Sequence, residues 1–448
     1  MDNQRPRVCV IGAGSSGITA CQNLAERGID FDCFEKSSTV GGNWRYENDN
    51  GMSAAYKSLH INTSRQMMEY DAFPMPVDYP DYPSHFQIAA YFDDYVDHFG
   101  LRDRIRFRTE VVEAVPAEGG WQVTVRSQDG ETESSNYTDL IVCNGHHWDA
   151  RWPEPAFPGS DEFTGIQMHA HDYRTPDILE GKRVLVLGIG NSATDISVES
   201  SRVAEKSFLS MRRGAWILPK YLAGRPTDLA TSGPFSRAPL ALQSASMKLL
   251  LRLSQGRLTD YGLPKPDHEP LHAHPTVSGE LVGRLGHGDI VVKPNIERFE
   301  GDSVVFADGS REQVDVIIYC TGYRITFPFF DDSVLNVEGN RIDLYRRVVS
   351  LEHPGLFFIG LIQPLGAIMP LAEAQSALVS DLIDGEGELP DRSAMARDIA
   401  AEQAAMDRRY VNSKRHTIQV DFDRYLRSLS REREESRRRV SRERVLSR

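Results

Sequence analysis

Two apolar runs, each followed by a glycine-rich turn, organise the hydrophobic and polar positions of this chain. Residues 7–11 and 182–187 each predict a buried strand that runs through glycines into a helix with a polar face. A further strand is expected after each helix, at 31–34 and near 207–213. Strand, turn, helix and strand in this order are typical of a dinucleotide-binding unit. The pattern therefore predicts two such units.

The other periodic segments predict a mixture of strands with few long helices. Apolar residues at helical spacing indicate a packing helix over 86–99, and leucines suggest another around 240–253. Alternating prolines and aromatic residues make 71–83 a stiff surface connection, and prolines at 153–158 mark a domain boundary. Strands are expected at 106–112, 121–127, 137–143, 288–294, 303–306, 314–320 and 355–360.

The first glycine turn has the spacing of a dinucleotide fingerprint. Gly12 permits the tight turn, Gly14 lets the backbone approach a pyrophosphate, and Gly17 lets the helix pack closely on the sheet. The next strand ends at Glu35, 23 residues after Gly12, where a carboxylate would accept a hydrogen bond from an adenosine ribose. Since a carboxylate repels a 2′-phosphate, this site favours FAD or NAD over NADP.

The second turn, 188–193, has alanine at the third glycine position, Ala193. Downstream, Arg212 lies 24 residues after Gly188, near the position that Glu35 has in the first unit. A guanidinium binds a 2′-phosphate bidentately, whereas a carboxylate would repel it. The first site is therefore interpreted as binding FAD and the second as binding NADPH. A solvated pair, Arg212 and Arg213, is the alternative.

Composition and charge exclude several classes of protein. The 448 residues are 40% apolar without an uninterrupted apolar run of 18, which predicts a globular chain of two or three domains and no membrane span. A net charge of -13 argues against a nucleic-acid partner. The strand close to the N-terminus leaves no room for a signal peptide. Five cysteines without a CxxC pair argue against a disulfide reductase and favour buried thiols in a reducing cytoplasm.

Two segments after the first unit carry a family resemblance. The sequence Gly41-Gly42-Asn43-Trp44 suits a backbone loop against a flat ligand, although an ordinary surface turn is the alternative. A GGxW loop after an FAD-type fingerprint resembles the class B flavin-dependent monooxygenases, in which this loop lies along the flavin. In that family an asparagine lies beside the isoalloxazine ring and the nicotinamide, and Asn62 matches it. A neutral amide can hydrogen-bond there without supplying a proton. An Asx turn made by Asn62 and Thr63 is the alternative.

A third segment narrows the resemblance. Phe163, Gly165, His169 and Tyr173 match FxGxxxHxxx followed by tyrosine or phenylalanine, the signature of the flavin-containing monooxygenases. The related Baeyer-Villiger enzymes usually have tryptophan at the last position. Tyr173 therefore makes the chain resemble the flavin-containing monooxygenases more than the Baeyer-Villiger enzymes. For His169 a structural linker is favoured, with a hydrogen-bonding hinge or a cofactor contact as alternatives. Residues 321–323 resemble the loop through which the family re-enters its FAD domain.

The resemblance covers the chain except 225–285 and the C-terminal tail. It implies an α/β fold with two dinucleotide-binding, Rossmann-like domains, the smaller NADPH domain (161–289) inserted into the FAD domain (1–160 and 290–448). The implied reaction is NADPH- and O₂-dependent monooxygenation through a C4a-hydroperoxyflavin. Sulfides, amines or, by Baeyer-Villiger reaction, ketones would be oxygenated. An NADPH oxidase that releases H₂O₂, and a non-catalytic flavin- and NADP-binding redox sensor, remain as alternatives.

The candidate site residues follow from the motifs and the resemblance together. Asn62 is the candidate catalytic residue, and no metal site is expected. The expected flavin-side contacts are Gly12, Gly14, Ser16, Gly17, Glu35, Gly42, Asn43, Trp44, Asn62, Thr63, Thr321, Gly322 and Gln363. The expected NADPH contacts are Gly188, Gly190, Asn191, Ser192, Ala193, Asp195, Ser210, Arg212 and Arg213.

The remaining segments carry less information. His268, His272 and His274 lie in a proline-rich stretch that favours a solvated connection over metal ligands. From Arg424 onward, arginines interspersed with glutamates predict a solvated helix or a frayed tail, with binding to an anionic surface as the minority interpretation. The tail lacks the hydrophobic anchor of microsomal family members. We therefore expect a cytoplasmic enzyme, with a small-molecule substrate and O₂ as partners, and leave a homodimer open.

Overall fold

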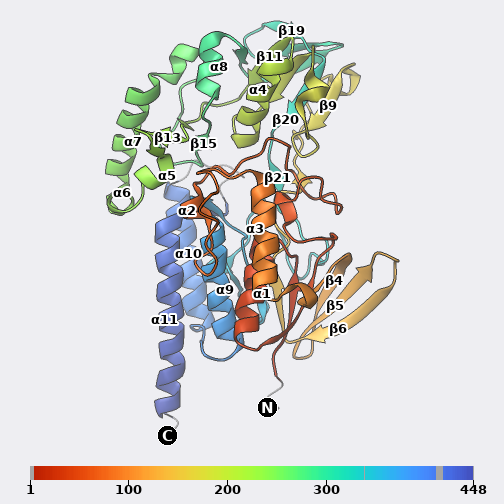
Figure 1. The fold of residues 1–448 in the computed structure, drawn as a ribbon, viewed down its shortest axis with the longest axis vertical. Helices are drawn as coiled ribbons and strands as arrows, with labels where there is room; N and C mark the ends of the chain where they lie inside the picture. Colours follow the sequence, from red (N-terminus) through yellow and green to blue (C-terminus); the bar gives the residue numbers. More distant parts are fainter. Residues whose placement is uncertain (1–4, 338, 410–416, 447–448) are drawn as a thin grey trace. The chain divides into compact units, whose positions relative to one another are not determined.

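The computed structural model describes residues 5–337, 339–409 and 417–446. The chain forms two compact units of mixed α/β structure (Figure 1). The first unit consists of Met1–Ser53, Thr63–Asp149 and Arg324–Arg448, and the second of Ala54–Asn62 and Ala150–Tyr323. The second unit is therefore an insertion in the first, as the expected fold class requires.

The boundaries of the units differ from the expected ones. Residues 290–323 were expected in the first unit but lie in the second. β16 (Ile290–Lys293) and β20 (Val316–Tyr319) pair with its strands β11 (Lys206–Ser210) and β10 (Arg183–Leu187), respectively. The second unit also begins earlier, at Ala150, and includes Ala54–Asn62. An apolar strand shows in its own sequence that it is buried, but not which of two similar sheets it joins.

A seven-stranded sheet forms the centre of the first unit, in the order β22, β23, β24, β7, β1, β2 and β3. The five strands from β24 to β3 run parallel, and β22 and β23 are antiparallel additions at one edge. The continuous apolar runs follow from burial on both faces of a parallel sheet. The strand bounds are Arg7–Ile11 (β1), Asp30–Phe34 (β2), Ile105–Arg106 (β3), Asp139–Val142 (β7), Leu344–Tyr345 (β22), Val349–Ser350 (β23) and Leu356–Phe358 (β24).

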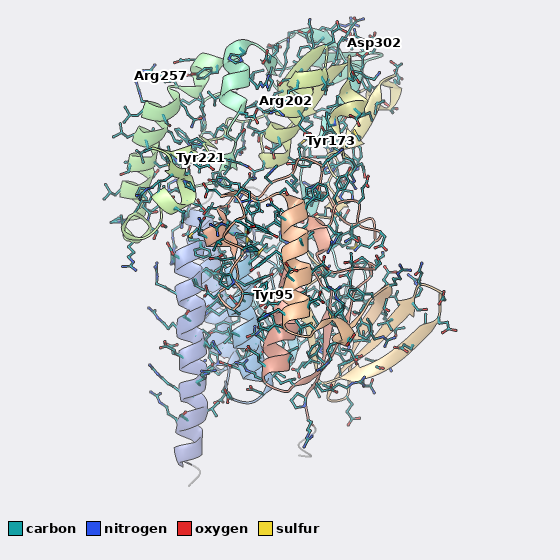
Figure 2. All side chains as sticks on the ribbon, viewed as in Figure 1. Tyr95, Tyr173, Arg202, Tyr221, Arg257 and Asp302 are labelled. Atoms are coloured by element: carbon teal, nitrogen blue, oxygen red, sulfur yellow. The ribbon has the colours of Figure 1, made fainter. Side chains whose placement is uncertain are left out.

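The helices of the first unit cover this sheet. The helix expected at 86–99 is α3, which begins with a capping box between Ser84 and Gln87 and buries Tyr95, labelled in Figure 2. α1 packs on α9, and α9 packs on α11 (Figure 1). No helix among the described residues is both long enough and apolar enough to cross a bilayer. The helix bounds are Ser15–Glu26 (α1), Arg65–Met68 (α2), His85–His98 (α3), Met369–Ile383 (α9), Arg392–Arg409 (α10) and Phe422–Leu446 (α11).

Two of the expected strands of this unit are broken. The strand expected at 106–112 is interrupted by Arg108, whose positive φ of 53° separates β3 from β4 (Thr109–Ala117). The strand expected at 137–143 is divided between β6 (Thr132–Tyr137) and β7. β4, β5 (Gly120–Ser127) and β6 form an antiparallel sheet over the buried Trp121.

The second unit repeats the parallel design on a smaller scale. Its five strands lie in the order β16, β11, β10, β20 and β9, and all four pairings are parallel. Their cores, such as 184–186 and 316–318, are fully buried. The remaining bounds are Ile166–His169 (β9), Arg183–Leu187 (β10) and Lys206–Ser210 (β11), with the helices Asn191–Val203 (α4) and Leu281–His287 (α8).

Smaller elements complete the second unit. The helix expected around 240–253 is α7 (Leu240–Gln255), and the strand expected at 303–306 is β18 (Ser303–Phe306). β18 lies between β17 (Ile296–Glu300) and β19 (Arg311–Gln313). The histidine-rich stretch is half-exposed and is also tied to α7, since Ser244 Oγ donates to the Pro270 carbonyl at 3.0 Å and Lys248 pairs with Glu269 at 2.8 Å.

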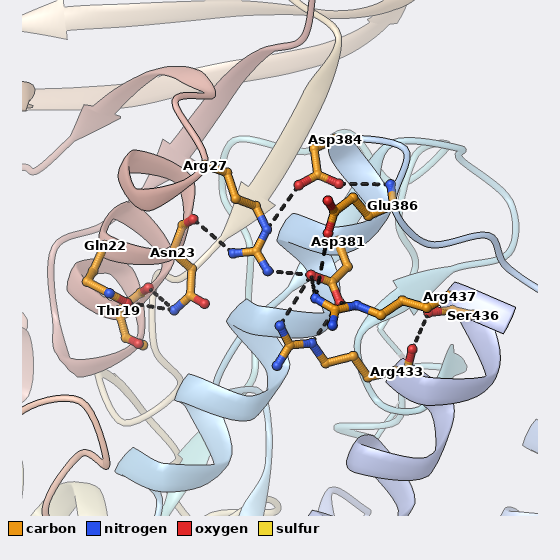
Figure 3. A network of polar contacts seen from close by, with 10 residues as sticks. All are labelled: Thr19, Gln22, Asn23, Arg27, Asp381, Asp384, Glu386, Arg433, Ser436 and Arg437. Carbon is orange, nitrogen blue, oxygen red and sulfur yellow. Dashed lines mark hydrogen bonds and ion pairs between the residues drawn. The ribbon is translucent and has the colours of Figure 1, made fainter. Parts of the chain in front are cut away.

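The arginine-rich tail is a helix, which confirms one of the two expectations, but part of its polar face is buried, which corrects the expectation of a solvated helix. Asp381 on α9 is fully buried and receives hydrogen bonds from Arg433 and Arg437 of α11, each at 2.7 Å (Figure 3). Arg27, the residue that follows α1, joins the same carboxylate. Burial alone would raise the pKa of Asp381, but the bonds from these three arginines hold it below its usual value. The signal was missed because Asp381 lies about fifty residues from its helix partners.

Candidate functional site

The first glycine turn joins β1 to α1 and leaves no space for a side chain at Gly12 or Gly17. Gly12 has a φ of +94°, and a Cβ there would lie 2.8 Å from the Cys143 carbonyl oxygen. A Cβ at Gly17 would lie 1.8 Å from the Gly12 carbonyl oxygen, so any side chain must open the turn. α1 begins after Gly14, and no side chain caps its first N–H groups. Bare backbone and uncapped donors fit the pyrophosphate of a dinucleotide.

Glu35 follows β2 directly, and its buried carboxylate is bonded to the same turn. Oε2 accepts the N–H of Ala13 at 2.7 Å, while Oε1 accepts the N–H and the hydroxyl of Ser37, both at 2.8 Å. Asn50 donates to Oε1 from 3.4 Å. Because a carboxylate oxygen has two lone pairs, Oε2 keeps one acceptor position. The carboxylate therefore fits a ribose hydroxyl and does not fit a 2′-phosphate.

The loop that carries Gly41-Gly42-Asn43-Trp44 packs directly on this turn. Gly41 donates its N–H to the Ala13 carbonyl at 3.0 Å, and a Cβ at Gly42 would lie 3.2 Å from the Gly14 Cα. The amide of Asn48 braces the loop by donating to the Gly42 carbonyl at 3.0 Å. The structure thus brings two glycine segments together, and it adds Asn48, for which the sequence held no signal.

Ser16 meets a glycine from the far end of the chain. A Cβ at Gly360, just after β24, would lie 2.0 Å from Ser16 Oγ. Gly360 donates its N–H to Gln375 Oε1 at 2.8 Å, and Gln375 Nε2 donates to the Tyr425 hydroxyl at 2.8 Å. Sequence reasoning predicted the strand and missed this brace. Gln363, expected at the flavin, lies on β25 (Gln363–Leu365), which pairs with β26 (Gln419–Asp421).

The second glycine turn has the same construction as the first. Gly188 has a φ of +136°, and a Cβ there would lie 2.7 Å from the Cys320 carbonyl oxygen. α4 begins after Gly190 without a side-chain cap, so its first N–H groups also remain available to phosphate. Ala193 is fully buried at the position that corresponds to Gly17. The geometry fits a second dinucleotide.

Strand register aligns the two turns residue by residue. Gly12 donates its N–H to the Phe34 carbonyl at 2.8 Å, and Gly188 donates to the Ser210 carbonyl at 2.9 Å. Glu35 therefore corresponds to Met211, and Arg212 lies one residue beyond that position. This corrects the expected correspondence of Arg212 with Glu35. The carboxylate of the first unit is replaced by a buried methionine.

The two arginines after β11 are both exposed but differ in their partners. Arg213 Nε lies 3.6 Å from Asp267 Oδ2. Within the described residues, Arg212 has no carboxylate at salt-bridge distance. Burial, and after it the charge of Arg212, lower the pKa of Arg151, which indicates that these two guanidinium groups share an electropositive region. Ser210, expected at the nucleotide, is buried and donates its hydroxyl to the Pro294 carbonyl at 2.6 Å.

The polar residues at the start of α4 hold the turn in place. Asn191 Oδ1 accepts the Val277 N–H at 2.8 Å, and Asp195 Oδ2 accepts the Tyr56 hydroxyl at 2.5 Å. Burial raises the pKa of Asp195 to about 6, against the opposing effects of the Tyr56 bond and of Lys220. Asp195 is therefore mostly ionised at neutral pH. Ser192 is half-buried and corresponds to Ser16 of the first turn.

Asn62 is the last residue of the Ala54–Asn62 segment, which belongs to the second unit. Its half-buried side chain makes no hydrogen bond with any described residue, and neither does that of Thr63, so the alternative Asx turn is not formed among them. The preceding Ile61 is fully buried, and Lys220 Nζ lies 3.5 Å from its carbonyl oxygen. The amide of Asn62 thus remains able to bond a ligand.

Three residues of the 163–173 signature have packing roles in the second unit. A Cβ at Gly165 would lie 2.5 Å from the Asp315 carbonyl oxygen, so only glycine fits. Phe163 packs on Phe299 with ring centroids 5.3 Å apart. Tyr173, labelled in Figure 2, is fully buried and donates its hydroxyl to Glu199 at 2.5 Å.

The signature histidine, His169, is fully buried among aromatic rings. Its centroid lies 5.9 Å from that of Trp152 and 5.4 Å from that of Tyr323. Nδ1 accepts the N–H of His171 at 3.0 Å. Burial, followed by the nearby His171, lowers the pKa of His169 to about 4, so the ring is neutral at pH 7. These features agree with a structural role and give the ring no means to act as an acid at neutral pH.

Thr321 and Gly322 lie in the second unit, not in the first as the resemblance implied. The Arg151 guanidinium donates to the Thr321 carbonyl at 2.8 Å, and the Arg151 N–H donates to the Gly322 carbonyl at 3.0 Å. These bonds fix the end of β20 to the start of the second unit. Arg151 was missed because nothing in the sequence distinguishes it from other surface arginines.

Two parallel-sheet units, each with an uncapped glycine turn, define a protein that binds two dinucleotides. The chain belongs to the family described as flavin-binding monooxygenase-like, whose model matches residues 5–435. It is 40% identical over 431 residues to flavin-containing monooxygenase 5 of Oryctolagus cuniculus, covering 93% of this chain and 80% of that protein. It is 35% identical over 439 residues to dimethylaniline monooxygenase [N-oxide-forming] 2 of Rattus norvegicus, covering 95% and 82%.

Solved structures agree with this assignment. S-allyl-L-cysteine S-oxygenase from Allium sativum has a TM-score of 0.72 at 25% identity, over 98% of this chain and 93% of that chain. A steroid monooxygenase bound to NADP has a TM-score of 0.72 at 20% identity, over 96% and 98%, and shows the same fold. As a family member, the chain is an NADPH-dependent flavin monooxygenase with FAD and NADPH as cofactors.

Proposed function

We propose that this enzyme transfers one oxygen atom of O₂ to a soft nucleophile, with an organic sulfide as its preferred class of substrate. NADPH supplies two electrons, and the second oxygen atom leaves as water. The Allium relative is an S-oxygenase and the Rattus relative is N-oxide-forming, so amines are the next class. Ketone oxygenation, a Baeyer-Villiger reaction, comes last, since the cyclohexanone monooxygenase structure is only 16% identical and shares the fold alone.

The observation that carries the proposal is the difference between the two turns. The first unit ends β2 with the buried carboxylate of Glu35, which accepts a ribose hydroxyl and fits FAD. The second unit has Met211 at this position, followed by the exposed Arg212, which has no carboxylate at salt-bridge distance among the described residues and fits the 2′-phosphate of NADPH. One enzyme that holds FAD in one unit and NADPH in the other has the parts that an NADPH-driven flavin oxygenation needs.

Within this scheme the protein supplies placement, while bound FAD supplies oxygen activation, through a C4a-hydroperoxyflavin as the family resemblance implies. The glycine turns position the two pyrophosphates. Asn62 offers a neutral amide that can bond a ligand. A neutral amide does not donate an acidic proton, and such a proton would favour loss of peroxide.

A comparison of three probe substrates tests the proposal. The purified enzyme would be supplied with NADPH, O₂ and methyl phenyl sulfide, N,N-dimethylaniline or cyclohexanone, and the product formed and H₂O₂ released per NADPH would be measured. We expect sulfoxide in the largest yield and little peroxide. Peroxide in place of every oxygenated product would identify an NADPH oxidase. Replacing Asn62 by Asp should keep FAD bound and raise the peroxide yield, and an unchanged yield would remove Asn62 from the site.

The compartment and assembly are part of the same proposal. All five cysteines are free thiols, four of them buried, which suits the reducing cytoplasm. A homodimer remains a proposal that sedimentation of the purified enzyme would test.

A further inference from the structure

The Ala54–Asn62 segment is built into the core of the second unit, although both of its flanks belong to the first unit. Tyr56 is 4% exposed and packs with Tyr173 in the same cluster as the α4 residues Ala193 and Ile196. Leu59 packs against that cluster. The backbone is tied as well, since Lys57 donates its N–H to the Arg174 carbonyl at 2.9 Å.

A polar network joins this segment to the helix that follows the second glycine turn. Asp195, five residues after Gly190 on α4, accepts the Tyr56 hydroxyl at 2.5 Å. Lys220 Nζ lies 3.5 Å from the Ile61 carbonyl oxygen, immediately before Asn62. The opposite charges of Lys220 and Asp195 also favour one another. One end of the network thus contacts the segment at Tyr56 and the other contacts it next to Asn62.

We propose that Tyr56, Asp195 and Lys220 are positioning residues that fix Asn62 relative to α4, and therefore relative to NADP held at the start of that helix. This inference rests on the proposed function of Asn62 and of the second turn. Reactions that depend on oriented groups lose rate and selectivity when a group moves by about 1 Å. Loosening the segment should therefore release peroxide before oxygen is transferred, without removing FAD.

The same core offers a matched control. Tyr173 donates its hydroxyl to Glu199 at 2.5 Å, and Glu199 lies one helical turn beyond Asp195 on α4. Both tyrosines are buried in one hydrophobic cluster, and both hydroxyl groups bond a carboxylate of the same helix. Of these two hydroxyl bonds, the Tyr56 bond involves the segment that ends in Asn62, and the Tyr173 bond does not. Phenylalanine at 173 is also permitted by the family signature.

The test uses the FAD-loaded enzyme with the substitutions Tyr56→Phe, Tyr173→Phe and Asp195→Asn. Hydrogen exchange of peptides covering 54–62 reports the segment, because the Lys57 and Leu59 amides are hydrogen-bonded there. H₂O₂ released per NADPH, with methyl phenyl sulfide as substrate, reports the reaction. Losing a bond to a charged group should speed exchange in Tyr56→Phe about tenfold or more and raise the peroxide yield. Tyr173→Phe should change neither. Asp195→Asn keeps an oxygen that accepts the Tyr56 hydroxyl but loses the charge that faces Tyr56 and Lys220, so it should shift exchange and the peroxide yield in the same direction as Tyr56→Phe, and by less.

Each outcome decides a different point. Unchanged exchange across 54–62 in Tyr56→Phe would overturn the anchor, whatever Asn62 does. Faster exchange with a wild-type peroxide yield would overturn the positioning role. Equal peroxide yields from Tyr56→Phe and Tyr173→Phe would show general loosening of the core and would also overturn it. If Asn62→Asp leaves the peroxide yield unchanged, the proposed function of Asn62 fails and positioning fails with it, while exchange still decides whether the anchor exists.

Discussion

The two dinucleotide units of this chain share one backbone plan and differ in the side chains that surround it. In each, a glycine with positive φ donates its N–H to the end of the neighbouring strand, and an uncapped helix follows. The first unit has Gly17 and Glu35 where the second has Ala193 and Met211. The shared parts fit a phosphate site, and we propose that the parts that differ select the nucleotide.

The helices after the turns are also held differently. α1 is braced by α9 and α11, through Arg27 and the buried Asp381. α4 is braced by the Ala54–Asn62 segment, through Tyr56 and Asp195. Each brace comes from a part of the sequence far from its turn. The glycine motif alone therefore does not specify a complete site, because the helix it starts needs support that the motif does not encode.

The largest expected effect comes from substituting the third small residue of each glycine turn, which is Gly17 in the first turn and Ala193 in the second. Gly17→Ala places a Cβ 1.8 Å from the Gly12 carbonyl oxygen, so the first turn must open. We expect the wild-type enzyme to be yellow with one FAD per chain and this variant to lose most of its flavin. Ala193→Gly only removes a buried methyl from the first turn of α4 and should cost about 1 kcal/mol. Flavin absorbance per chain and the unfolding midpoint measure both effects.

In this comparison the control is the second turn. A Gly17→Ala protein that retains stoichiometric FAD would show that the first turn is as tolerant as the second. The structural difference between the two turns would then have no functional meaning.

Sequence alone gave the local parts of this site. The glycine turns, Glu35, the 86–99 helix and the α/β class depend on neighbouring residues, and the structure contains them. The parts it missed depend on distant pairings, such as Gln375 with Gly360, Asp381 with the tail arginines, and residues 290–323 with the second sheet. The one-residue shift between Arg212 and Met211 was missed for a related reason, since counting from a glycine does not fix strand register.

The next largest effect concerns nucleotide preference. Arg212→Ala should lower kcat/KM for NADPH by about one to two decades, the equivalent of roughly 1.5 to 3 kcal/mol for a charge-assisted contact. NADH should be nearly unaffected because it lacks the 2′-phosphate. Steady-state kinetics with both nucleotides measure the preference. The double variant of Arg212 and Arg213 tests whether the second arginine shares the contact.

The register suggests a sharper version of the same test. Met211→Glu places a carboxylate at the position of Glu35 and should reduce the NADPH preference even with Arg212 intact. Lys36, which corresponds to Arg212 in the first unit and pairs with Glu110 at 2.8 Å, provides the control. Lys36→Ala should leave the preference unchanged. If the double arginine variant keeps the wild-type preference, the arginines are only a solvated pair.

The smallest expected effect is a pH dependence of the stability, which comes from Asp195, the α4 residue that bonds Tyr56. The pKa of Asp195 is raised to about 6 in the folded protein, first by burial, from about 3.9 in an unfolded chain. Between these values the folded state binds more protons than the unfolded state, so stability falls as pH rises through the window. Asp195→Asn cannot ionise and escapes this loss. Its stability relative to wild type should therefore rise by about 1 kcal/mol between pH 5 and pH 7.5.

Asp315→Asn, in the same unit, is the control, because its stability relative to wild type should not change with pH over the same range. The Arg183 bond lowers the pKa of Asp315 to about 2, so its stabilising contribution is complete above about pH 5 and is lost only in stronger acid. The difference between Asp315→Asn and wild type should stay constant from pH 5 to pH 7.5. Histidine titrations are common to all three proteins and cancel. Parallel curves for Asp195→Asn and Asp315→Asn in denaturant unfolding would mean that Asp195 is ionised as easily as a surface carboxylate, which would contradict its raised pKa.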